Sequence, residues 1–259
     1  MRNLRGKIAI VTGGARGLGK AMAERLAIEG VHVVIADRLR EETQETVSAF
    51  RGKGYDVDFI IVDLLDVAQI NEMVDEVVKK YGRIDILVNN AGVQIRKKAV
   101  EFTENDWDTL MGVNLKAYYF ASCAAARHMI KAGSGAIVCT SSENSARFTS
   151  KRTLYAVSKG AVNAMVGALA VEWARYGIRI NAVAPGFIDT EMHRTAIAQG
   201  VLNDDELLTV LPNKRLLLAD EIADAVCYLA SDDASGVVGQ VLFVDGGCNV
   251  NCLPESKEL

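Results

Sequence analysis

Tyr155 and Lys159 are the two residues of this chain whose types and spacing are best suited to chemistry. Side chains four positions apart on a helix lie on the same face, one turn from each other. A lysine ammonium favours the ionised form of a nearby phenol, so we expect the pKa of Tyr155 to fall below its reference of about 10. Such a phenol could donate or accept a proton near neutral pH. The pair alone could also be an exposed tyrosine beside a solvated lysine, so the surrounding sequence has to decide.

The rest of the chain alternates short apolar, β-branched runs with longer helical patterns. Several of these runs are apolar throughout, as the strands of a parallel sheet covered on both faces are. The alternation predicts an α/β fold, namely a single-domain, Rossmann-like, doubly wound parallel sheet of about seven strands flanked by helices. Candidate strands occupy residues 7–12, 31–36, 57–62, 84–88, 135–140, 178–184 and 240–244, and helical stretches lie near 18–29, 40–53, 68–81, 104–131, 154–176 and 219–230.

The domain organisation is expected to be simple. The chain has three prolines and no linker or low-complexity stretch, so residues 1–249 should form one domain, followed by a polar tail at 250–259. Residues 187–215 show weak periodicity and mixed polarity. We expect this segment to be an insertion near the carboxyl edge of the sheet, where such folds bind ligands.

Composition excludes several classes of partner. The 259 residues carry a net charge of −4 with both signs interspersed, so no basic face is expected for nucleic acid. We find no apolar run long enough to span a membrane and no signal-peptide core. The five cysteines are irregularly spaced and no metal-ligand pattern accompanies them, so we expect no metal and interpret them as small buried hydrophobes or idle thiols. A cytoplasmic protein is expected.

A glycine-rich turn follows the first predicted strand and precedes a helix. Gly13, Gly17 and Gly19 would let the chain turn sharply and bring its backbone close to a pyrophosphate at the helix N-terminus, with Arg16 and Leu18 between them. The spacing is G-x-x-x-G-x-G rather than the common G-x-G-x-x-G. A purely structural turn is the alternative, but the position between strand and helix favours a nucleotide.

Asp37, at the end of the second predicted strand, should decide which dinucleotide binds. A carboxylate there accepts hydrogen bonds from the adenosine ribose and repels a 2′-phosphate, which predicts NAD over NADP. Arg16 and Arg38 oppose this interpretation, because a guanidinium could pair with that phosphate. Other residues at the same sheet edge would flank the adenosine, namely Asp63, Asn89, Ala91 and Gly92.

Taken together, these residues resemble the short-chain dehydrogenase/reductase family over nearly the whole chain, from about residue 6 to 247. The resemblance rests on the segments 12–19 and 89–92, on Asn114, Ser142, Tyr155 and Lys159, and on the segments 185–186 and 244–247. It implies hydride transfer between a nicotinamide cofactor and a CH–OH group, with Asn114, Ser142, Tyr155 and Lys159 as a catalytic tetrad. It also implies that Ile188 and Thr190, following Pro185 and Gly186, lie against the nicotinamide carboxamide.

Elementary chemistry agrees with those implied roles. Ser142 could hydrogen-bond the substrate oxygen, and Tyr155 could take or return its proton. Lys159 could bind the nicotinamide ribose. Asn114 lies within a long helical pattern, where an amide is mildly unfavourable. A distortion of the helix there would free a backbone carbonyl for a water that links Lys159 to solvent; the alternative is an amide on the helix surface.

The substrate side is expected to be polar. Hydrogen-bonding groups suit a polyhydroxylated or anionic substrate better than a steroid or a long acyl chain. Segments 93–97 and 126–129 are similar to gluconate 5-dehydrogenases and related sugar-acid dehydrogenases. These polar residues could instead line a solvated rim. The candidate substrate residues are Gln94, Arg96, Ser142, Asn144, Arg147 and His193.

Three functions compete. The leading hypothesis is an NAD-dependent oxidoreductase acting on a polar secondary alcohol or ketone, such as a sugar or sugar acid. The alternatives are a 3-oxoacyl-carrier-protein reductase using NADPH and a nucleotide-sensing protein without catalysis. A homotetramer is expected, because the helix at 154–176 is apolar nearly all round and strand 239–244 is a candidate sheet edge. An insertion folded over that helix would instead leave a monomer.

Overall fold

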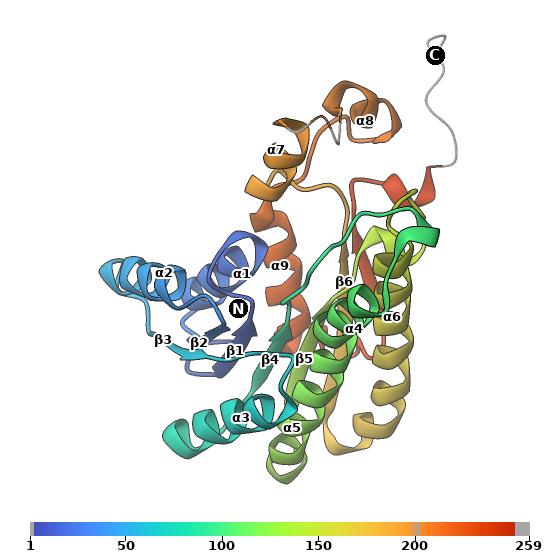
Figure 1. The fold of residues 1–259 in the computed structure, drawn as a ribbon. Coiled ribbons are helices and arrows are strands. Elements are labelled where there is room, and N and C mark those ends of the chain that lie inside the picture. The colour runs from blue at the N-terminus through green and yellow to red at the C-terminus, as the bar shows by residue number, and fades with distance from the viewer. Residues whose placement is uncertain (1–2, 199, 201–202, 252–259) are drawn as a thin grey trace.

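Seven strands form one parallel sheet at the centre of the molecule (Figure 1). The computed structural model describes residues 3–198, 200 and 203–251. The strand order is β3-β2-β1-β4-β5-β6-β7, so the direction of winding reverses between β1 and β4. The predicted fold class is therefore confirmed. The strands are β1 (Ile8–Thr12), β2 (His32–Asp37), β3 (Val57–Ile61), β4 (Ile86–Asn89), β5 (Gly135–Thr140), β6 (Ile178–Pro185) and β7 (Val241–Val244).

Helices cover both faces of the sheet because neighbouring strand residues point to opposite sides. On β1, the side chain of Ile10 enters one apolar cluster while those of Ala9 and Val11 enter the other, and all three are fully buried. The first cluster is completed by α3 (Val67–Tyr81), α5 (Ala117–Ala132) and α6 (Thr153–Trp173). The second is completed by α1 (Gly17–Ile28), α2 (Arg40–Gly52) and α9 (Ala219–Ala230).

The insertion predicted at 187–215 contains two short helices that stand above the carboxyl edge of the sheet (Figure 1). These are α7 (Glu191–Ala198) and α8 (Asp204–Val210). Ile188 pairs with Leu217 in an isolated parallel bridge, which closes the base of the insertion. Helices of two turns are too short to show a clear apolar period, so the sequence pattern predicted none there. The predicted tail begins at residue 250, and its residues 252–259 lie outside the described part.

The single helix predicted at 104–131 is interrupted. It consists of α4 (Glu104–Met111), a π-helical turn η2 (Gly112–Lys116) and α5. Gly112 lies against Leu65, and a Cβ at this position would approach the Leu65 Cδ2 atom to 2.6 Å. The interruption therefore coincides with a close contact to a loop that is remote in sequence. It also contains Asn114.

Helix α6 corrects the expectation that no apolar stretch of the chain is long enough to span a membrane. Residues 153–176 are long and apolar enough to cross a membrane by length and composition alone, with a mean hydropathy of 1.4. In the fold, α6 packs against β6 and contributes Val162, Val166 and Leu169 to the core. Its apolar residues are therefore explained in part by the sheet that it covers.

Candidate active site

The turns after β1 and β4 are hydrogen-bonded to each other at the point where the strand order reverses. Thr12 Oγ1 accepts hydrogen bonds from the backbone N–H groups of Asn90 at 3.0 Å and Ala91 at 3.2 Å. Gly13 has φ of +66°, and a Cβ there would lie 2.7 Å from the Ala91 Cα. A Cβ at Gly19 would collide with the Gly13 carbonyl oxygen. Only glycine allows this close approach, which leaves the carboxyl edge open for a ligand.

The N-terminus of α1 opens onto this edge. Gly17 has φ of +57°, and a Cβ there would meet nothing within 4 Å. Arg16 is exposed at the N-cap, and within the described chain its side chain caps no backbone N–H group. The free N–H groups and the helix dipole suit a pyrophosphate. The glycine cradle and this helix end therefore fit a dinucleotide, whereas the partly buried Leu18 packs against the core cluster behind them.

Asp37 lies where the sequence predicted, at the end of β2. Its side chain is 9% exposed and accepts hydrogen bonds from the backbone N–H groups of Ala15 and Leu39, each at 3.1 Å. These bonds hold a carboxylate beside the glycine-rich turn. Arg38 is exposed next to it.

Two predicted adenosine contacts have structural partners. The buried Asn89 side chain donates to Ser122 Oγ at 2.9 Å, so it faces α5 rather than a ligand at the edge. That the turn 89–92 flanks the adenosine stays a prediction. Asp63 is exposed and accepts a hydrogen bond from the Leu65 N–H group at 3.0 Å. Asn90, which lies in the predicted turn 89–92 but was not singled out as a candidate, donates to the carbonyl oxygens of Thr12 and Gly13 at 3.1 and 3.3 Å.

Tyr155 and Lys159 occupy one face of α6, as predicted, but the predicted direction of the tyrosine pKa is wrong. Burial raises the pKa of Tyr155, and a hydrogen bond with Ser142 only partly opposes that effect. The Lys159 ammonium lies 5.8 Å from the centroid of the tyrosine ring. Burial also lowers the pKa of Lys159 to about 8, which weakens the positive charge that was expected to act on the phenol. The low polarity around both groups outweighs their proximity.

Lys159 is buried and hydrogen-bonded to the end of β5, whereas Tyr155 remains accessible. The lysine is 2% exposed and its Nζ atom donates to the carbonyl oxygen of Thr140, the last residue of β5, at 2.6 Å. Tyr155 is only partly buried. Ser142 follows β5 and is 7% exposed, and its Oγ atom accepts a hydrogen bond from the Asn144 N–H group at 3.1 Å. A hydroxyl, a phenol and an ammonium thus meet at the carboxyl edge.

Asn114 is a completely buried residue, not an amide on the helix surface. Its Oδ1 atom accepts from the Val93 N–H group at 2.8 Å, and its Nδ2 atom donates to the Val93 carbonyl oxygen at 3.0 Å. Nδ2 also lies 3.2 Å from Ser158 Oγ. One side chain therefore joins the π-helical turn, the segment after Gly92 and α6. Turns of π-helix are frequent at functional sites.

The segment after β6 approaches the site closely. Pro185 ends β6, and a Cβ at Gly186 would lie 2.7 Å from the Asp245 Cα, so glycine is required where the chain crosses the end of β7. Ile188 is partly buried against the core. Thr190 Oγ1 accepts from the His193 N–H group at 3.2 Å, and the His193 side chain is buried.

The predicted substrate residues divide into two groups. Arg96 is partly buried and its Nε atom donates to Gln94 Oε1 at 3.3 Å, which orders one wall of the site. Arg147 instead donates through Nη1 to the carbonyl oxygens of Cys248 and Asn251. Its guanidinium ties the loop after β5 to the end of the described chain, and its role toward substrate stays a prediction. Asn144 is 1% exposed.

Two charged residues were missed by the sequence prediction. Arg152 and Glu143 are 7% and 4% exposed, and both act electrostatically on Tyr155. Burial raises the pKa of Glu143 to about 7, against the opposing effect of Arg152. The proximity of Arg152 to Tyr155 in sequence was the available signal. Among the described residues, no group of three or more His, Cys, Asp or Glu is arranged to hold a metal ion.

The geometry defines the class of protein. A glycine cradle at the switch point of a parallel sheet, with a Ser–Tyr–Lys group at the same edge, belongs to an oxidoreductase that uses a nicotinamide dinucleotide. A family model described as enoyl-(acyl carrier protein) reductase matches residues 13–249. The chain belongs to the short-chain dehydrogenase/reductase family and acts on CH–OH groups. The resemblance seen in the sequence is confirmed.

Several relatives are similar over nearly their whole length. A 3-oxoacyl-[acyl-carrier-protein] reductase of Thermotoga maritima is 39% identical, covering 94% of this chain and 98% of the relative. A gluconate 5-dehydrogenase of Gluconobacter oxydans is 37% identical, covering 96% and 97%. The crystal structure of a gluconate 5-dehydrogenase from Burkholderia cenocepacia in complex with NADP and tartrate is 38% identical, with a TM-score of 0.91 and coverage of 96% and 98%.

Proposed function

We propose that this enzyme transfers hydride between NAD and a polar secondary alcohol or ketone, such as a sugar or sugar acid. The observation that carries the proposal is the partly exposed Tyr155 phenol, hydrogen-bonded to Ser142 and backed by the buried Lys159. This group shares the carboxyl edge with the glycine cradle. A substrate alcohol bound there could therefore give its proton to Tyr155 and its hydride to the cofactor at the same site.

The roles follow from the contacts. Ser142 would hold the substrate oxygen, and Tyr155 would take its proton in oxidation or return it in reduction. When bound, the nicotinamide accepts or supplies the hydride. Lys159, whose pKa is lowered by burial to about 8, would hold the nicotinamide ribose. The π-helical turn around Asn114 would leave a backbone carbonyl for a water that connects Lys159 to solvent.

The preference for NAD rests on Asp37. Its carboxylate is fixed by two backbone N–H groups beside the glycine-rich turn, so it cannot move away from a 2′-phosphate without losing them. Repulsion between this carboxylate and the 2′-phosphate of NADP disfavours NADP. Some structural neighbours carry NADP, and the exposed Arg16 and Arg38 are the residues through which this chain could accept it. We weight the fixed carboxylate above the two exposed guanidinium groups.

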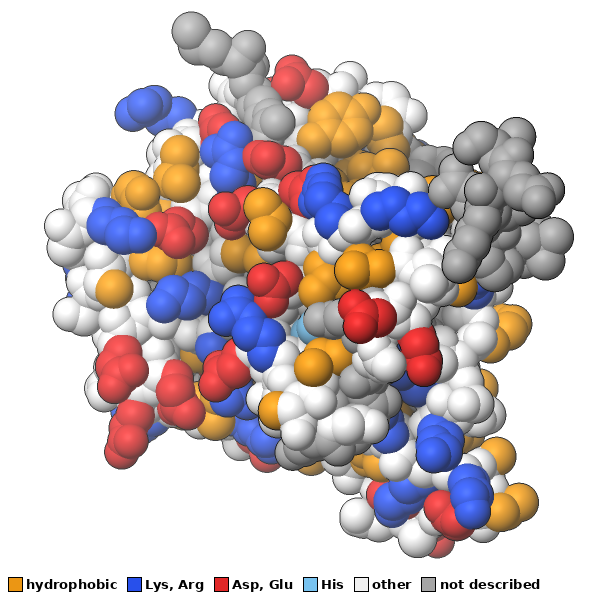
Figure 2. Space-filling model, turned by 90° about the horizontal axis from the view of Figure 1, so that it is seen from above, with side chains coloured by type: hydrophobic (Ala, Val, Ile, Leu, Met, Phe, Trp, Pro, Cys, Tyr) orange, Lys and Arg blue, Asp and Glu red, His pale blue; other side chains and the backbone are white. Residues whose placement is uncertain are grey.

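The polar wall favours a hydroxylated or acidic substrate. Gln94 and Arg96 are hydrogen-bonded to each other, and Asn144 and Arg152 are buried close to Ser142 and Tyr155 in the chain. Seen from above, the described residues of this face show basic, acidic and apolar side chains intermixed rather than a broad basic patch suited to an acidic carrier protein (Figure 2). A 3-oxoacyl-carrier-protein reductase remains the second candidate, favoured by the 39% identical relative.

We further propose a homotetramer in the cytoplasm. A hollow of about 820 Å³ lies on the outer face of α4, α5 and α6, lined by Tyr119, Phe120, Ala161 and Ala168 among others. Val157 and Val171 of α6 are 45% and 84% exposed. Strand β7 forms one edge of the sheet. Two separate surfaces of this kind support dihedral assembly. The four described cysteines are free thiols, as is usual in a reducing compartment.

A substrate panel tests the reaction class and the substrate together. Sugar acids, polyols, hydroxysteroids and small alcohols are incubated with NAD or NADP, and nicotinamide absorbance is followed. We expect turnover with polar substrates and NAD. Hydride transfer with no member of the panel would favour the nucleotide-sensing alternative, and activity confined to acyl thioester substrates with NADPH would favour the carrier-protein reductase.

A further inference from the structure

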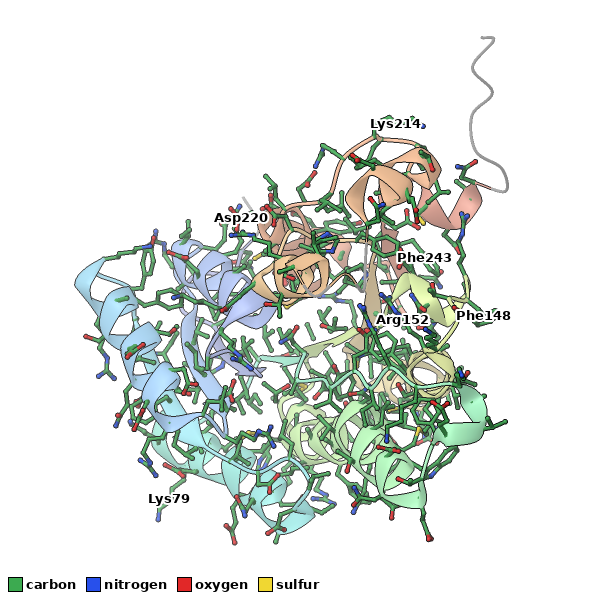
Figure 3. The ribbon with its side chains drawn as sticks, turned by 45° about the horizontal axis from the view of Figure 1, so that its top comes forward. Lys79, Phe148, Arg152, Lys214, Asp220 and Phe243 are labelled. Carbon is green, nitrogen blue, oxygen red and sulfur yellow. The ribbon has the colours of Figure 1, made fainter. Side chains whose placement is uncertain are left out.

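Arg152 is a buried cation without a matched partner. It is 7% exposed, and in the described part of the chain its guanidinium makes no hydrogen bond or ion pair. Its Cζ atom lies 5.9 Å from the centroid of the Phe187 ring, so the side chain extends toward the segment that follows β6. Figure 3 shows Arg152 inside the molecule, while Phe148 of the same loop lies at the outer edge. Buried guanidinium groups are normally paired.

The charges around Arg152 leave its surroundings positive. Arg96 is close enough for the two guanidinium groups to repel each other, which adds to the effect of burial in lowering the pKa of Arg96. Glu143 is the carboxyl that faces Arg152, and its pKa of about 7 means that it is only partly ionised at neutral pH. Lys97 does not contribute, because it pairs with Asp106 at 2.6 Å.

We propose that Arg152, together with Arg96, binds the carboxylate of the substrate, so that the enzyme selects hydroxy acids over neutral polyols. Arg152 precedes α6 and lies three residues before Tyr155, which places the anion site beside the group that exchanges the proton. A guanidinium matches a carboxylate in planar, bidentate geometry. The inference rests on the proposed reaction at Tyr155 and names the substrate class for it.

A single negative charge fits this site better than a phosphate. Glu143 is 4% exposed, and its Oε1 atom accepts a hydrogen bond from Asn144 Nδ2 at 3.2 Å, so the carboxyl is fixed near the proposed ligand. A dianion would repel any ionised fraction of Glu143 more strongly than a carboxylate would. Arg152 therefore acts as a specificity residue for a monoanionic hydroxy acid.

The test compares an acid with its neutral amide. Gluconate and gluconamide have the same hydroxyl groups and differ in one charge. We expect wild type to prefer gluconate, and Arg152→Gln to raise the KM for gluconate about 10- to 100-fold. The same variant should raise the KM for gluconamide less than about threefold. Because Arg152 also lowers the pKa of Tyr155, any change in kcat should be shared by both substrates. Arg152→Lys should recover part of the preference. Arg175→Gln, at an exposed position beyond the far end of the same helix, is the matched control.

Calorimetry of gluconate binding to the enzyme–NAD complex gives a readout that needs no turnover. Loss of gluconate binding in Arg152→Gln, with NAD binding retained, supports the carboxylate site even if the oxidised position lies in another hydroxy acid. Equal increases in KM for gluconate and gluconamide would overturn the inference and make Arg152 a structural residue. So would a wild type that does not distinguish the acid from the amide. Absence of all hydride transfer would reject the proposed function instead.

Discussion

Replacing Lys159 with methionine should stabilise the protein near neutral pH while removing its activity. Burial lowers the pKa of Lys159 from 10.5 to about 8, a difference of about 2.5 pKa units. At about 1.4 kcal/mol per unit, keeping this charge in the fold costs about 3.5 kcal/mol. The methionine leaves the Thr140 carbonyl without the donor now at 2.6 Å, which costs about 1 kcal/mol. The expected net gain in the free energy of unfolding is about 2.5 kcal/mol.

This gain should depend on pH in a defined direction. The folded-state pKa of Lys159 lies below the unfolded one, so between about pH 8 and pH 10.5 the unfolded chain binds a proton that the folded protein has lost. The contribution of Lys159 to stability therefore rises across this window, and its penalty is complete below about pH 8. The advantage of the variant should be largest at pH 7. Near pH 10 the two proteins should be about equally stable, because about 0.8 kcal/mol of the lysine penalty remains there and the lost hydrogen bond of about 1 kcal/mol offsets it.

Urea unfolding of both proteins from pH 7 to pH 10, without cofactor and at one protein concentration, measures this difference. Only the difference in the free energy of unfolding between variant and wild type is informative. Burial raises the pKa of Cys139 to about 12 and of Cys248 to about 11, and these thiols lower the stability of both proteins at high pH. Lys131→Met, at an exposed position on α5, is the control and should change little. A Lys159→Met variant that is less stable at pH 7, or whose difference from wild type is independent of pH, would refute this reasoning.

Three further outcomes test the other assignments. Tyr155→Phe should lower kcat at least about 100-fold and leave NAD affinity, measured by fluorescence titration, within about twofold; retention of most activity would remove the proton-transfer role. Asp37→Ser should improve the NADP to NAD ratio of kcat/KM about tenfold or more, unlike Asp63→Ser at the exposed neighbouring strand end. A wild type that already prefers NADP would show that the arginines dominate. Light scattering at micromolar concentration should report a mass of about four chains. Ala168→Glu places a charge in the hollow between the outer helices and should reduce that mass. A monomeric wild type would contradict the proposed assembly.

Much of the fold could be predicted because its causes are local. A run of β-branched residues such as 31–36 forms a strand wherever both faces are covered, and β2 begins and ends within one residue of that prediction. The glycines after β1 are likewise readable, because positive φ at Gly13 and Gly17 demands that residue type. The two short helices of the insertion escaped prediction, since so few turns leave no clear period.

The candidate site was predictable in its reactive groups and not in its environment. Tyr155 and Lys159 are one helical turn apart, and that spacing alone places them on one face. Neither residue type reveals how many distant elements bury it. Arg147 and Arg152 are only five residues apart in one loop, yet one is tied to backbone carbonyls and the other is buried beside the Phe187 ring.

The sequence by itself determined the class of fold, the glycine-rich turn and the pairing of Tyr155 with Lys159 on one helix face, because each depends on residue type and on local spacing. The tertiary structure decided the direction of the Tyr155 pKa, the bridging role of Asn114 and the inward placement of Asn89. Each of these depends on desolvation or on hydrogen bonds to segments remote in sequence. The sequence shows only that the lysine lies one helical turn from the tyrosine. In the folded protein both groups lose hydration, and this loss outweighs the favourable effect of the lysine charge on the phenol.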